Sequence, residues 1–404
     1  MSDPFVIVGA DAAGLSAASK CRRTDPDREV VVFDAGSWVS FAHCGTPYYV
    51  KGEIEELTAM TALTPAEVKE RGIDLRVGHR VSAVDTSEQL VTVETPDGQM
   101  ELAYASLLIA TGAHARTTPL ADERLDGVFT LHGLDDAAAI RAFLTDPTAY
   151  SRDDVGADER LAWDRVDAMG MMDAPDQMAI IGGGYVGVEM AEALAAWDVD
   201  VVLLHRGPRL LEGFGQTAGD RAVEALETLG ITVELETEVQ SVEAVDGQLS
   251  AVLAADGRSW AAQGAIVGTG ITPATNLIAD TPIALGDSGA IATDAFGETS
   301  VSGVYAAGDV AESIHVVTGE PTWDPLGLPA NRAGRAIGAT IAGEQTTVGQ
   351  VAHTAMVKAG AIEVGRTGVI RDDAAVAAGF DPVTVEIEAH SRSHYYPGAE
   401  PLWV

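Results

Sequence analysis

The stretch FVIVGADAAG, residues 5–14, decides the fold of this 404-residue chain. Its first four residues form a short apolar run, which is typical of a strand buried in a parallel sheet. A glycine-rich turn from Gly9 to Gly14 follows, and the next residues continue at helical spacing. A second apolar run, VVVF, then ends in Asp34, twenty residues beyond Gly14. A strand, a glycine turn, a helix and a distal acid in this order predict a dinucleotide-binding unit.

Each part of this first unit has a physical task. Gly9 makes the tight turn, Gly14 lets the helix pack closely on the strand, and the helix amides receive a pyrophosphate. We expect the Asp34 carboxylate to bind the adenosine ribose hydroxyls. Asp11 stands where the pattern usually has its middle glycine, and it is the one departure from the fingerprint.

A second unit begins with MAIIGGGYVG at residues 178–187, which contains the full G-x-G-x-x-G pattern. Its second strand ends in His205 and Arg206, with Arg209 close by. An acid at this position would select NAD, whereas cations accommodate a 2'-phosphate. NADPH is therefore the expected cofactor and NADH the alternative. A second interpretation is that His205 only caps the strand.

Two dinucleotide units in one chain predict that one binds a flavin and the other a nicotinamide, so that electrons pass between them. The segments LLIATG at 107–112 and AIVGTG at 265–270 read as strand–turns where the chain leaves and re-enters the first domain. The segment GVYAAGD at 303–309 delivers Asp309 to a helix start, where a carboxylate can bind the ribityl chain of a flavin. A further helix, begun by PLGLPANR at 325–332, is expected at the flavin's edge.

We expect cofactor contacts from the glycine turns, from the strand ends and from the helix starts just described. These residues are Gly9, Ala10, Ala13, Gly14, Asp34, Ser40, Ala110, Thr111, Gly112, Gly182, Gly184, Tyr185, Val186, Gly187, Glu189, His205, Arg206, Gly270, Gly308, Asp309, Pro329 and Ala330.

The charge balance is strongly acidic, with 61 acidic against 25 basic residues and a net charge of -36. Such a surface repels nucleic acids and anionic membranes, so we exclude both as partners. Only 4 lysines stand against 21 arginines, and the acids are spread along the chain. This pattern indicates adaptation to high salt, in which mobile ions screen the self-repulsion.

The sequence shows neither a signal peptide nor an apolar run of membrane-spanning length, which predicts a soluble, cytoplasmic protein.

The segment SFAHCGTPYY at residues 40–49 holds Cys44, one of two cysteines in the chain. Thr46 and Pro47 read as the N-cap and first residue of a helix, which would place Cys44 at the helix mouth and favour its thiolate. A single cysteine there can form a mixed disulfide or a sulfenic acid, but no dithiol. The alternative is a structural cysteine. Cys21, inside the first helix, is interpreted as a small core residue.

Three basic residues, Lys20, Arg22 and Arg23, lie at the end of the first helix. They predict a site for a substrate phosphate, and simple compensation of the helix dipole is the alternative.

We do not assign His43 as a base, because neighbouring residues of an extended segment point to opposite sides. His390 and His394 have a helical metal-ligand spacing, but their surroundings read as strand or loop, so no metal site is predicted. The acidic stretch near 146–176 reads as an exposed insertion.

Together these motifs, over nearly the whole chain, resemble the pyridine nucleotide-disulfide oxidoreductases, in particular their single-cysteine branch. That branch holds coenzyme A disulfide reductases, NADH oxidases and peroxidases, and persulfide reductases. The resemblance implies an α/β fold with two Rossmann-like dinucleotide-binding domains and a shortened C-terminal α+β dimerisation domain. The implied boundaries are 1–118 and 272–345 for FAD, 119–271 for NAD(P), and 346–404 for dimerisation.

Two features of the sequence distinguish between the members of this branch. The oxidases and peroxidases carry a histidine in the first glycine turn, where this chain has Ala12. The segment HYYPG at 394–398 resembles a C-terminal segment of the coenzyme A disulfide reductases, in which a tyrosine reaches the partner subunit's active site. Tyr395 or Tyr396 would be that residue, in a homodimer. Family members usually continue for some tens of residues beyond this point, so the dimerisation domain is expected to be incomplete.

The resemblance implies an NAD(P)H:disulfide oxidoreductase in which FAD passes electrons from NADPH to a disulfide between Cys44 and coenzyme A. It assigns the coenzyme A phosphates to Arg23 and its neighbours. The implied substrate-binding residues are Lys20, Arg22, Arg23, Ser40 and Phe41. An NAD(P)H oxidase or a persulfide or polysulfide reductase is the alternative on the same scaffold. An electron-transfer flavoprotein with a structural cysteine is the alternative of another class.

Overall fold

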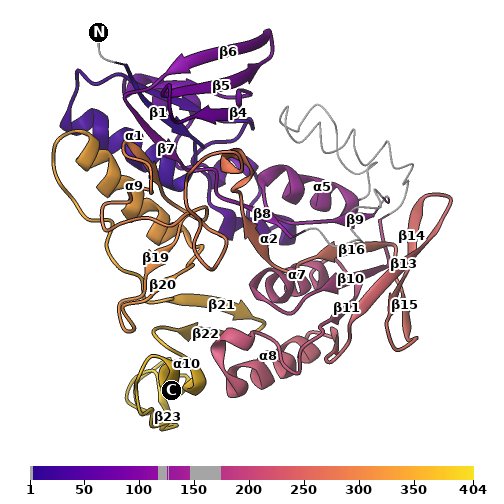
Figure 1. The fold of residues 1–404 in the computed structure, drawn as a ribbon. Coiled ribbons are helices and arrows are strands. Elements are labelled where there is room, and N and C mark those ends of the chain that lie inside the picture. Colours follow the sequence, from indigo (N-terminus) through magenta and orange to yellow (C-terminus); the bar gives the residue numbers. More distant parts are fainter. Residues whose placement is uncertain (1–2, 117–124, 126, 146–173) are drawn as a thin grey trace.

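In the computed structural model, the described residues are 3–116, 125, 127–145 and 174–404. The predicted insertion at 146–176 lies outside this range, except for its last three residues. Two parallel sheets organise the rest of the chain (Figure 1). The predicted α/β fold with two dinucleotide-binding units is confirmed.

The first sheet has five parallel strands whose buried residues are almost all apolar. Their order is β18 (Val304–Ala306), β7 (Ser106–Ile109), β1 (Phe5–Val8), β2 (Val30–Phe33) and β3 (Asp74–Arg76). Alternate residues of β1 pack on opposite faces of this sheet, as the period of two requires. Helices α1 (Ala12–Thr24) and α9 (Gly327–Ile341) cover one face. The antiparallel strands β4 (Arg80–Asp85), β5 (Leu90–Thr95) and β6 (Gly98–Ala103) cover the other.

Helices α1 and α9 approach each other closely enough to exclude side chains at the crossing. A Cβ added at Gly334 would lie 2.1 Å from the carbonyl oxygen of Ala13, and one at Gly338 would lie 2.2 Å from that of Ala17. Helix α9, which begins at Gly327, therefore packs directly on α1, the helix that follows the first glycine turn. The first unit is therefore completed by a segment that is distant in sequence.

The second sheet repeats this design. Its parallel strands are, in order, β12 (Thr232–Glu234), β11 (Asp200–Leu204), β10 (Gln177–Ile181), β16 (Gly264–Val267) and β9 (Val128–Phe129). One face packs on α5 (Leu134–Leu144), α7 (Tyr185–Ala195) and α8 (Gln216–Thr228). The other packs on the antiparallel strands β13 (Val239–Val245), β14 (Gln248–Ala254) and β15 (Ser259–Ala261). Strands β8 (Ala113–Ala115) and β17 (Ile271–Pro273) pair where the chain passes between the halves.

The remaining elements are short. They are α2 (Thr46–Lys51), α3 (Pro65–Glu70), β19 (Ser313–Ile314), β20 (Pro321–Thr322), β21 (Ala355–Ala359), β22 (Ile362–Arg366), α10 (Asp372–Ala377), β23 (Glu388–His390) and β24 (Pro401–Trp403), with 3₁₀ turns at His43–Gly45, Leu57–Met60, Glu212–Phe214 and Asn276–Ile278. Helix α2 lies between α5 and α7, at the junction of the two halves. The C-terminal hairpin of β23 and β24 lies at the far lower end of the molecule in Figure 1, away from α2.

Candidate active site

The first glycine turn leaves no room for side chains at its two outer glycines. Gly9 has φ +109°, and a Cβ there would lie 2.1 Å from the carbonyl oxygen of Ala110. A Cβ at Gly14 would lie 1.9 Å from the carbonyl oxygen of Gly9. Gly112, at the end of the neighbouring strand β7, instead faces open space, with nothing within 4 Å of an added Cβ. This combination of a tight turn and an open strand end fits a bound dinucleotide.

Asp34 is oriented by two backbone amides at the end of β2. Ala10 donates to its Oδ2 at 2.7 Å and Gly36 donates to its Oδ1 at 2.8 Å. Burial raises the pKa of Asp34, although both amide hydrogen bonds oppose the rise. A carboxylate fixed beside the glycine turn fits the ribose of a dinucleotide bound there.

Asp309 comes from the end of β18 and lies close to the same turn. Gly308, with φ +81°, places its would-be Cβ 3.2 Å from the Cβ of Ala13 and 3.6 Å from that of Ala330. The indole nitrogen of Trp323 donates to the carbonyl oxygen of Asp309 at 2.8 Å. Burial raises the pKa of Asp309 to about 6, against the opposing charge of His43. One continuous surface is thus formed by the first glycine turn, Asp309 and the start of α9, which includes Pro329.

Cys44 lies in a 3₁₀ turn, His43–Gly45, that runs directly into α2. The amide of Gly45 donates to Ala42 at 3.0 Å, and the hydroxyl of Thr46 donates to the carbonyl of His43 at 2.7 Å. The helix begins at Thr46, with Gly45 as its N-cap, so the prediction that Thr46 is the cap is wrong by one residue. The premise of an extended segment at His43 is wrong as well. Cys44 itself is exposed, whereas Cys21 is buried.

The electrostatic expectation for Cys44 is also wrong. Although Cys44 is an exposed residue, the protein atoms around its sulfur partly desolvate it. This desolvation, followed by the charges of Glu189 and Asp309, raises the pKa of the Cys44 thiol, and a backbone hydrogen bond only partly offsets the rise. The adjoining helix α2 has six residues, so its dipole is small beside two carboxylates. These carboxylates come from different halves: Glu189 follows the second glycine turn, and Asp309 follows β18. Cys44 therefore lies where the two dinucleotide units meet.

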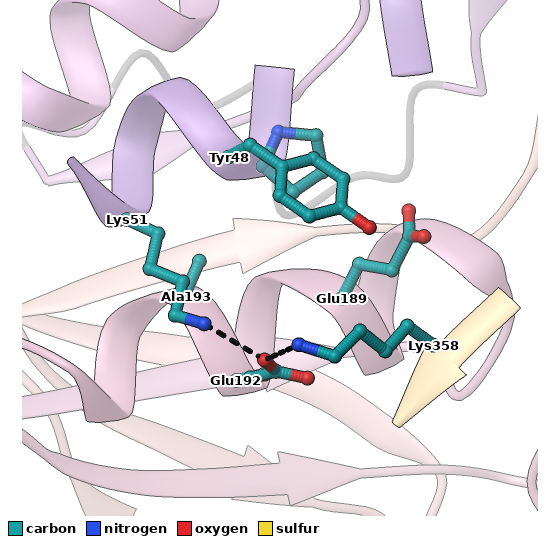
Figure 2. A pocket seen from close by; sticks show the side chains of 7 residues that line it. Tyr48, Lys51, Glu189, Glu192, Ala193 and Lys358 are labelled. Atoms are coloured by element: carbon teal, nitrogen blue, oxygen red, sulfur yellow. Dashed lines mark hydrogen bonds and ion pairs between the residues drawn. The ribbon is translucent and has the colours of Figure 1, made fainter. Parts of the chain in front are cut away.

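Figure 2 shows the pocket between α2, α7 and β21, beside this junction. Glu192 accepts hydrogen bonds from Lys51 at 2.9 Å, from Lys358 at 3.0 Å and from the amide of Gly360 at 2.9 Å. Half of the chain's lysines therefore converge on one carboxylate. None of the sequence motifs predicted this cluster, and the scarcity of lysine was the only signal that could have indicated it.

Glu189 lies one helical turn from Glu192 and has a different environment. The Tyr48 phenol points toward its carboxylate in Figure 2. Burial and the charge of Glu192 raise the pKa of Glu189 to about 7, and a hydrogen bond from the amide of Lys358 only partly lowers it. Close to neutral pH, this carboxyl therefore holds its proton about half of the time. It is the residue of the second unit that acts most strongly on Cys44.

The second glycine turn repeats the geometry of the first. A Cβ at Gly182 would lie 2.3 Å from the carbonyl oxygen of Gly268, and one at Gly187 would lie 1.8 Å from that of Gly182. Gly184 and Gly270 face open space. Tyr185, which follows the turn with Val186, packs edge-on against Phe214 with ring centroids 5.3 Å apart. The open face of this turn fits a second dinucleotide.

His205 and Arg206 differ in their surroundings at the end of β11. The ring nitrogen Nδ1 of His205 accepts a hydrogen bond from the amide of Gly183 at 3.1 Å, which ties the strand end to the turn. Burial lowers the pKa of His205, and the nearby Glu212 opposes this. Arg206 is exposed. Of the two residues, Arg206 is therefore the cation that a 2'-phosphate can reach without rearrangement.

The predicted phosphate-binding residues on α1 are not equivalent. Lys20 forms an ion pair with Glu344 at 2.8 Å, and Arg22 donates to the carbonyl oxygens of Pro26 and Arg28. Arg23 is exposed, and within the described part of the chain it shows neither an ion pair nor a hydrogen bond. Ser40 has φ +51° and, like Phe41, borders the Cys44 turn. Arg23 is the member of the set that remains available to a ligand.

Tyr395 and Tyr396 are exposed and lie in the segment between β23 and β24, and β23 lies away from α2, the helix that follows Cys44, in Figure 1. Neither is brought to the site within one chain. In the described residues, no group of three potential metal ligands gathers. Among these residues, none of the helices combines the length and apolar character needed to cross a bilayer.

Comparison with known proteins places this geometry in a family. The model of the family described as "Pyridine nucleotide-disulphide oxidoreductase" matches residues 3–325. An NAD(P)H sulfur oxidoreductase (CoA-dependent) of Pyrococcus abyssi is 36% identical over 99% of this chain and 82% of its own length. An NAD(P)H coenzyme A polysulfide/persulfide reductase of Pyrococcus horikoshii is 35% identical over 100% and 84%. A coenzyme A disulfide reductase of Staphylococcus haemolyticus is 27% identical over 98% and 82%.

Two solved structures carry the same fold. An NAD-dependent persulfide reductase from A. fulgidus superposes with a TM-score of 0.87 at 29% identity, over 99% of this chain and 70% of that one. Reduced CoADR-RHD of Bacillus anthracis superposes with a TM-score of 0.88 at 26% identity, over 100% and 68%.

Proposed function

This chain belongs to the pyridine nucleotide-disulphide oxidoreductase family, and on that premise we propose that it uses NAD(P)H to reduce a sulfur–sulfur bond of a coenzyme A derivative at Cys44. The observation that carries the proposal is the position of the one exposed thiol. Cys44 directly precedes α2, which packs between α5 and α7 of the second unit, and the amide of Phe41 donates to Asp11 of the first glycine turn, so the thiol lies between the two units. The other cysteine, Cys21, is buried, and its pKa is raised to about 11.

Under this proposal, the first turn and Asp34 hold FAD, with Asp309 at the ribityl chain. The second turn holds NADPH, with Glu189 near the nicotinamide and Arg206 at the 2'-phosphate. When bound, a flavin supplies two-electron transfer between a nicotinamide and a sulfur–sulfur bond. The tight glycines and open strand ends at both turns support these assignments.

The chain's own chemistry is the exchange of a disulfide. The Cys44 thiolate attacks one sulfur of the substrate, a Cys44–sulfur bond forms, and the substrate's sulfur–sulfur bond breaks. The departing thiolate takes a proton and leaves as a thiol. Two electrons and a proton from NADPH then return Cys44 to its thiolate and release the second thiol. The overall reaction consumes one NADPH, one proton and one disulfide and yields two thiols.

Coenzyme A disulfide is the first proposed substrate, with its phosphates at Arg23. A coenzyme A persulfide or polysulfide is the second, because the relative named for those substrates is 35% identical, whereas the coenzyme A disulfide reductase is 27% identical. The domain boundaries given above, a cytoplasmic location and a homodimer in which Tyr395 or Tyr396 reaches the partner's site belong to the same proposal.

An anaerobic acceptor series tests the proposal. The enzyme is reduced with one equivalent of NADPH and then mixed with coenzyme A disulfide, with a coenzyme A persulfide, or with oxygen. We expect rapid reoxidation by one of the sulfur compounds, and loss of that reaction in the Cys44→Ser variant. Rapid reoxidation by oxygen alone would identify an oxidase. Unchanged turnover of Cys44→Ser with every sulfur acceptor would identify an electron-transfer flavoprotein with a structural cysteine.

A further inference from the structure

The side chain of Asp11 does not cap helix α1, although its position suggests that it should. Asp11 is the N-cap of α1, where an aspartate normally accepts a hydrogen bond from the first turn of the helix, yet its side chain makes no such bond. Instead its carboxylate turns toward the segment that carries Cys44. Oδ1 accepts a hydrogen bond from the amide of Phe41 at 3.0 Å, and Oδ2 lies 2.9 Å from Nε2 of His43. Both oxygens of one carboxylate are thus used on a single turn.

His43 is held from its other side as well. Its Nδ1 lies 2.8 Å from the carbonyl oxygen of His132, which comes just before α5. A carbonyl oxygen can only accept, so Nδ1 carries a proton, and a carboxylate at Nε2 requires a second one. The imidazolium form of the ring is therefore the one that can donate to both partners. The ring of Phe41 packs on it with centroids 4.3 Å apart.

The charges around His43 agree with this state. Burial alone would lower its pKa, but the hydrogen bond and charge of Asp11, the carbonyl of His132 and the charge of Asp309 raise the pKa overall. The ring of His132, 5.5 Å away, is the other titratable group that faces it, and burial lowers the pKa of that ring. The side chains of His43 and Asp11 are 45% and 29% exposed, so solvent screens the pair.

We propose that Asp11 and His43 are positioning residues for Cys44: together they form a clamp that fixes the 3₁₀ turn of the thiol to the first glycine turn and to the segment before α5. This inference rests on the proposed role of Cys44. The clamp holds the residue directly before Cys44, and the residues that follow Cys44 donate back across it, Gly45 to the carbonyl oxygen of Ala42 and Thr46 to that of His43. The imidazole of His43 therefore contacts the first glycine turn, although this chain has Ala12 at the position where the oxidases and peroxidases carry a histidine.

The clamp has a physical consequence for thiol chemistry. Attack on a disulfide requires the sulfur to approach along the sulfur–sulfur axis, so a mobile turn lowers the rate without changing the binding of NADPH. A fixed turn keeps Cys44 at the junction of the two units. As pH rises through the raised pKa of His43, one of its two donors is lost and the clamp weakens.

The test uses the full chain with its bound cofactor and two readouts. Hydrogen exchange of the peptide that holds residues 40–46 reports the clamp, because the Phe41 amide donates to Asp11. The rate at which Cys44 reacts with 4,4'-dithiodipyridine reports its position, since the neutral probe releases one pyridinethione as the Cys44 disulfide forms. The variants are Asp11→Ala, Asp11→Asn, which keeps an acceptor for Phe41, and His43→Gln. His132→Gln is the matched control, because it removes the ring but keeps the carbonyl.

We expect faster exchange and an approximately tenfold slower probe reaction in Asp11→Ala, as for a lost charge-assisted hydrogen bond. Asp11→Asn and His43→Gln should lie between Asp11→Ala and the wild type, and His132→Gln should match the wild type. Unchanged exchange in Asp11→Ala would overturn the clamp. Faster exchange with an unchanged probe rate would overturn its positioning role. Turnover that survives in Cys44→Ser would instead refute the proposed function, and the exchange data would still report the clamp.

Discussion

Cys44 and Cys21 show which properties of a cysteine can be predicted from residue identity and local sequence alone. Both are single thiols near a helix, but one is exposed at the junction of two domains and the other is buried inside α1. The Ser-Phe-x-x-Cys pattern singled out the first. It could not give the sign of the electrostatic effect, because Glu189 and Asp309 come from segments more than 140 residues away in the chain. Such charges become visible only once the fold brings them together.

Glu189 gives a prediction at this scale. Its pKa in the folded state, about 7, is above its unfolded value, so its contribution to stability is fully present below the unfolded pKa and is lost as pH rises toward 7. Replacing it by glutamine should stabilise the protein by about 1–2 kcal/mol at pH 8 and by little at pH 5. Urea unfolding of the two proteins at both pH values measures this. Glu70→Gln, on the exposed surface, is the control. An equal effect at both pH values would contradict the assignment.

Arg206 gives a second residue-scale prediction, on cofactor choice. Removing its charge in Arg206→Ala should lower kcat/KM for NADPH about tenfold, because a charge-assisted contact to the 2'-phosphate is lost, and should leave NADH nearly unaffected. Arg23→Ala is the matched control, since it should raise KM for coenzyme A disulfide and leave NADPH unchanged. Steady-state kinetics with both cofactors check this. Equal losses with NADPH and NADH would place the 2'-phosphate elsewhere.

At the scale of elements, the glycine turns were the most predictable part of the chain. Gly9, Gly14, Gly182 and Gly187 face backbone atoms at about 2 Å from an added Cβ, so the sequence pattern has a local steric cause. The turn at Cys44 was less predictable. Phe41 and His43 contact Asp11 and the segment before α5, which are distant in sequence, so local propensity could not indicate these contacts.

The junction of α2, α7 and β21 carries a prediction of its own. Burial would raise the pKa of Glu192, but the hydrogen bonds from Lys51 and Lys358 lower it overall, so its contribution to stability is present above the unfolded pKa and is lost as pH falls through the folded one. Glu192→Gln should destabilise the protein by about 1–3 kcal/mol at pH 7, since Lys358 loses its ion-pair partner and Lys51 keeps only its pair with Glu53.

Chemical unfolding at pH 7 and at low pH measures this effect, which should shrink in acid. The control is Asp373→Asn, which removes an exposed pair with Arg371 on α10 and should change stability little. If the two substitutions have the same effect, the cluster is an ordinary surface ion pair.

At the scale of the whole molecule, the charge of -36 sets the conditions under which the fold is stable. Self-repulsion among dispersed carboxylates is screened by salt, because the Debye length falls from about 10 Å at 0.1 M to about 3 Å at 1 M. Raising NaCl over this range should increase the unfolding midpoint by several degrees, and KCl should act alike. Thermal unfolding followed by circular dichroism measures it. A midpoint that is unchanged or that falls with salt would contradict adaptation to high salt.

The architecture of the whole chain was predictable because it rests on two repeated local patterns. The two parallel sheets, each with helices on one face, follow from the two glycine fingerprints and the family resemblance, whereas the antiparallel layer on the other face of each sheet was not predicted. The relation of Tyr395 and Tyr396 to Cys44 could not be tested in one chain, because β23, which precedes the two tyrosines, lies away from α2, which follows Cys44. It remains a prediction about a dimer.

The central claim is that Cys44 exchanges its thiol with a coenzyme A sulfur–sulfur bond, and mass analysis of the Cys44 peptide tests it most directly. The NADPH-reduced enzyme is freed of excess cofactor, mixed with coenzyme A disulfide and quenched in acid. The proposal predicts one coenzyme A per chain, attached to Cys44 by a disulfide, retained in Cys21→Ser and removed by a second addition of NADPH. A Cys44 peptide that stays unmodified while coenzyme A disulfide is consumed would contradict it.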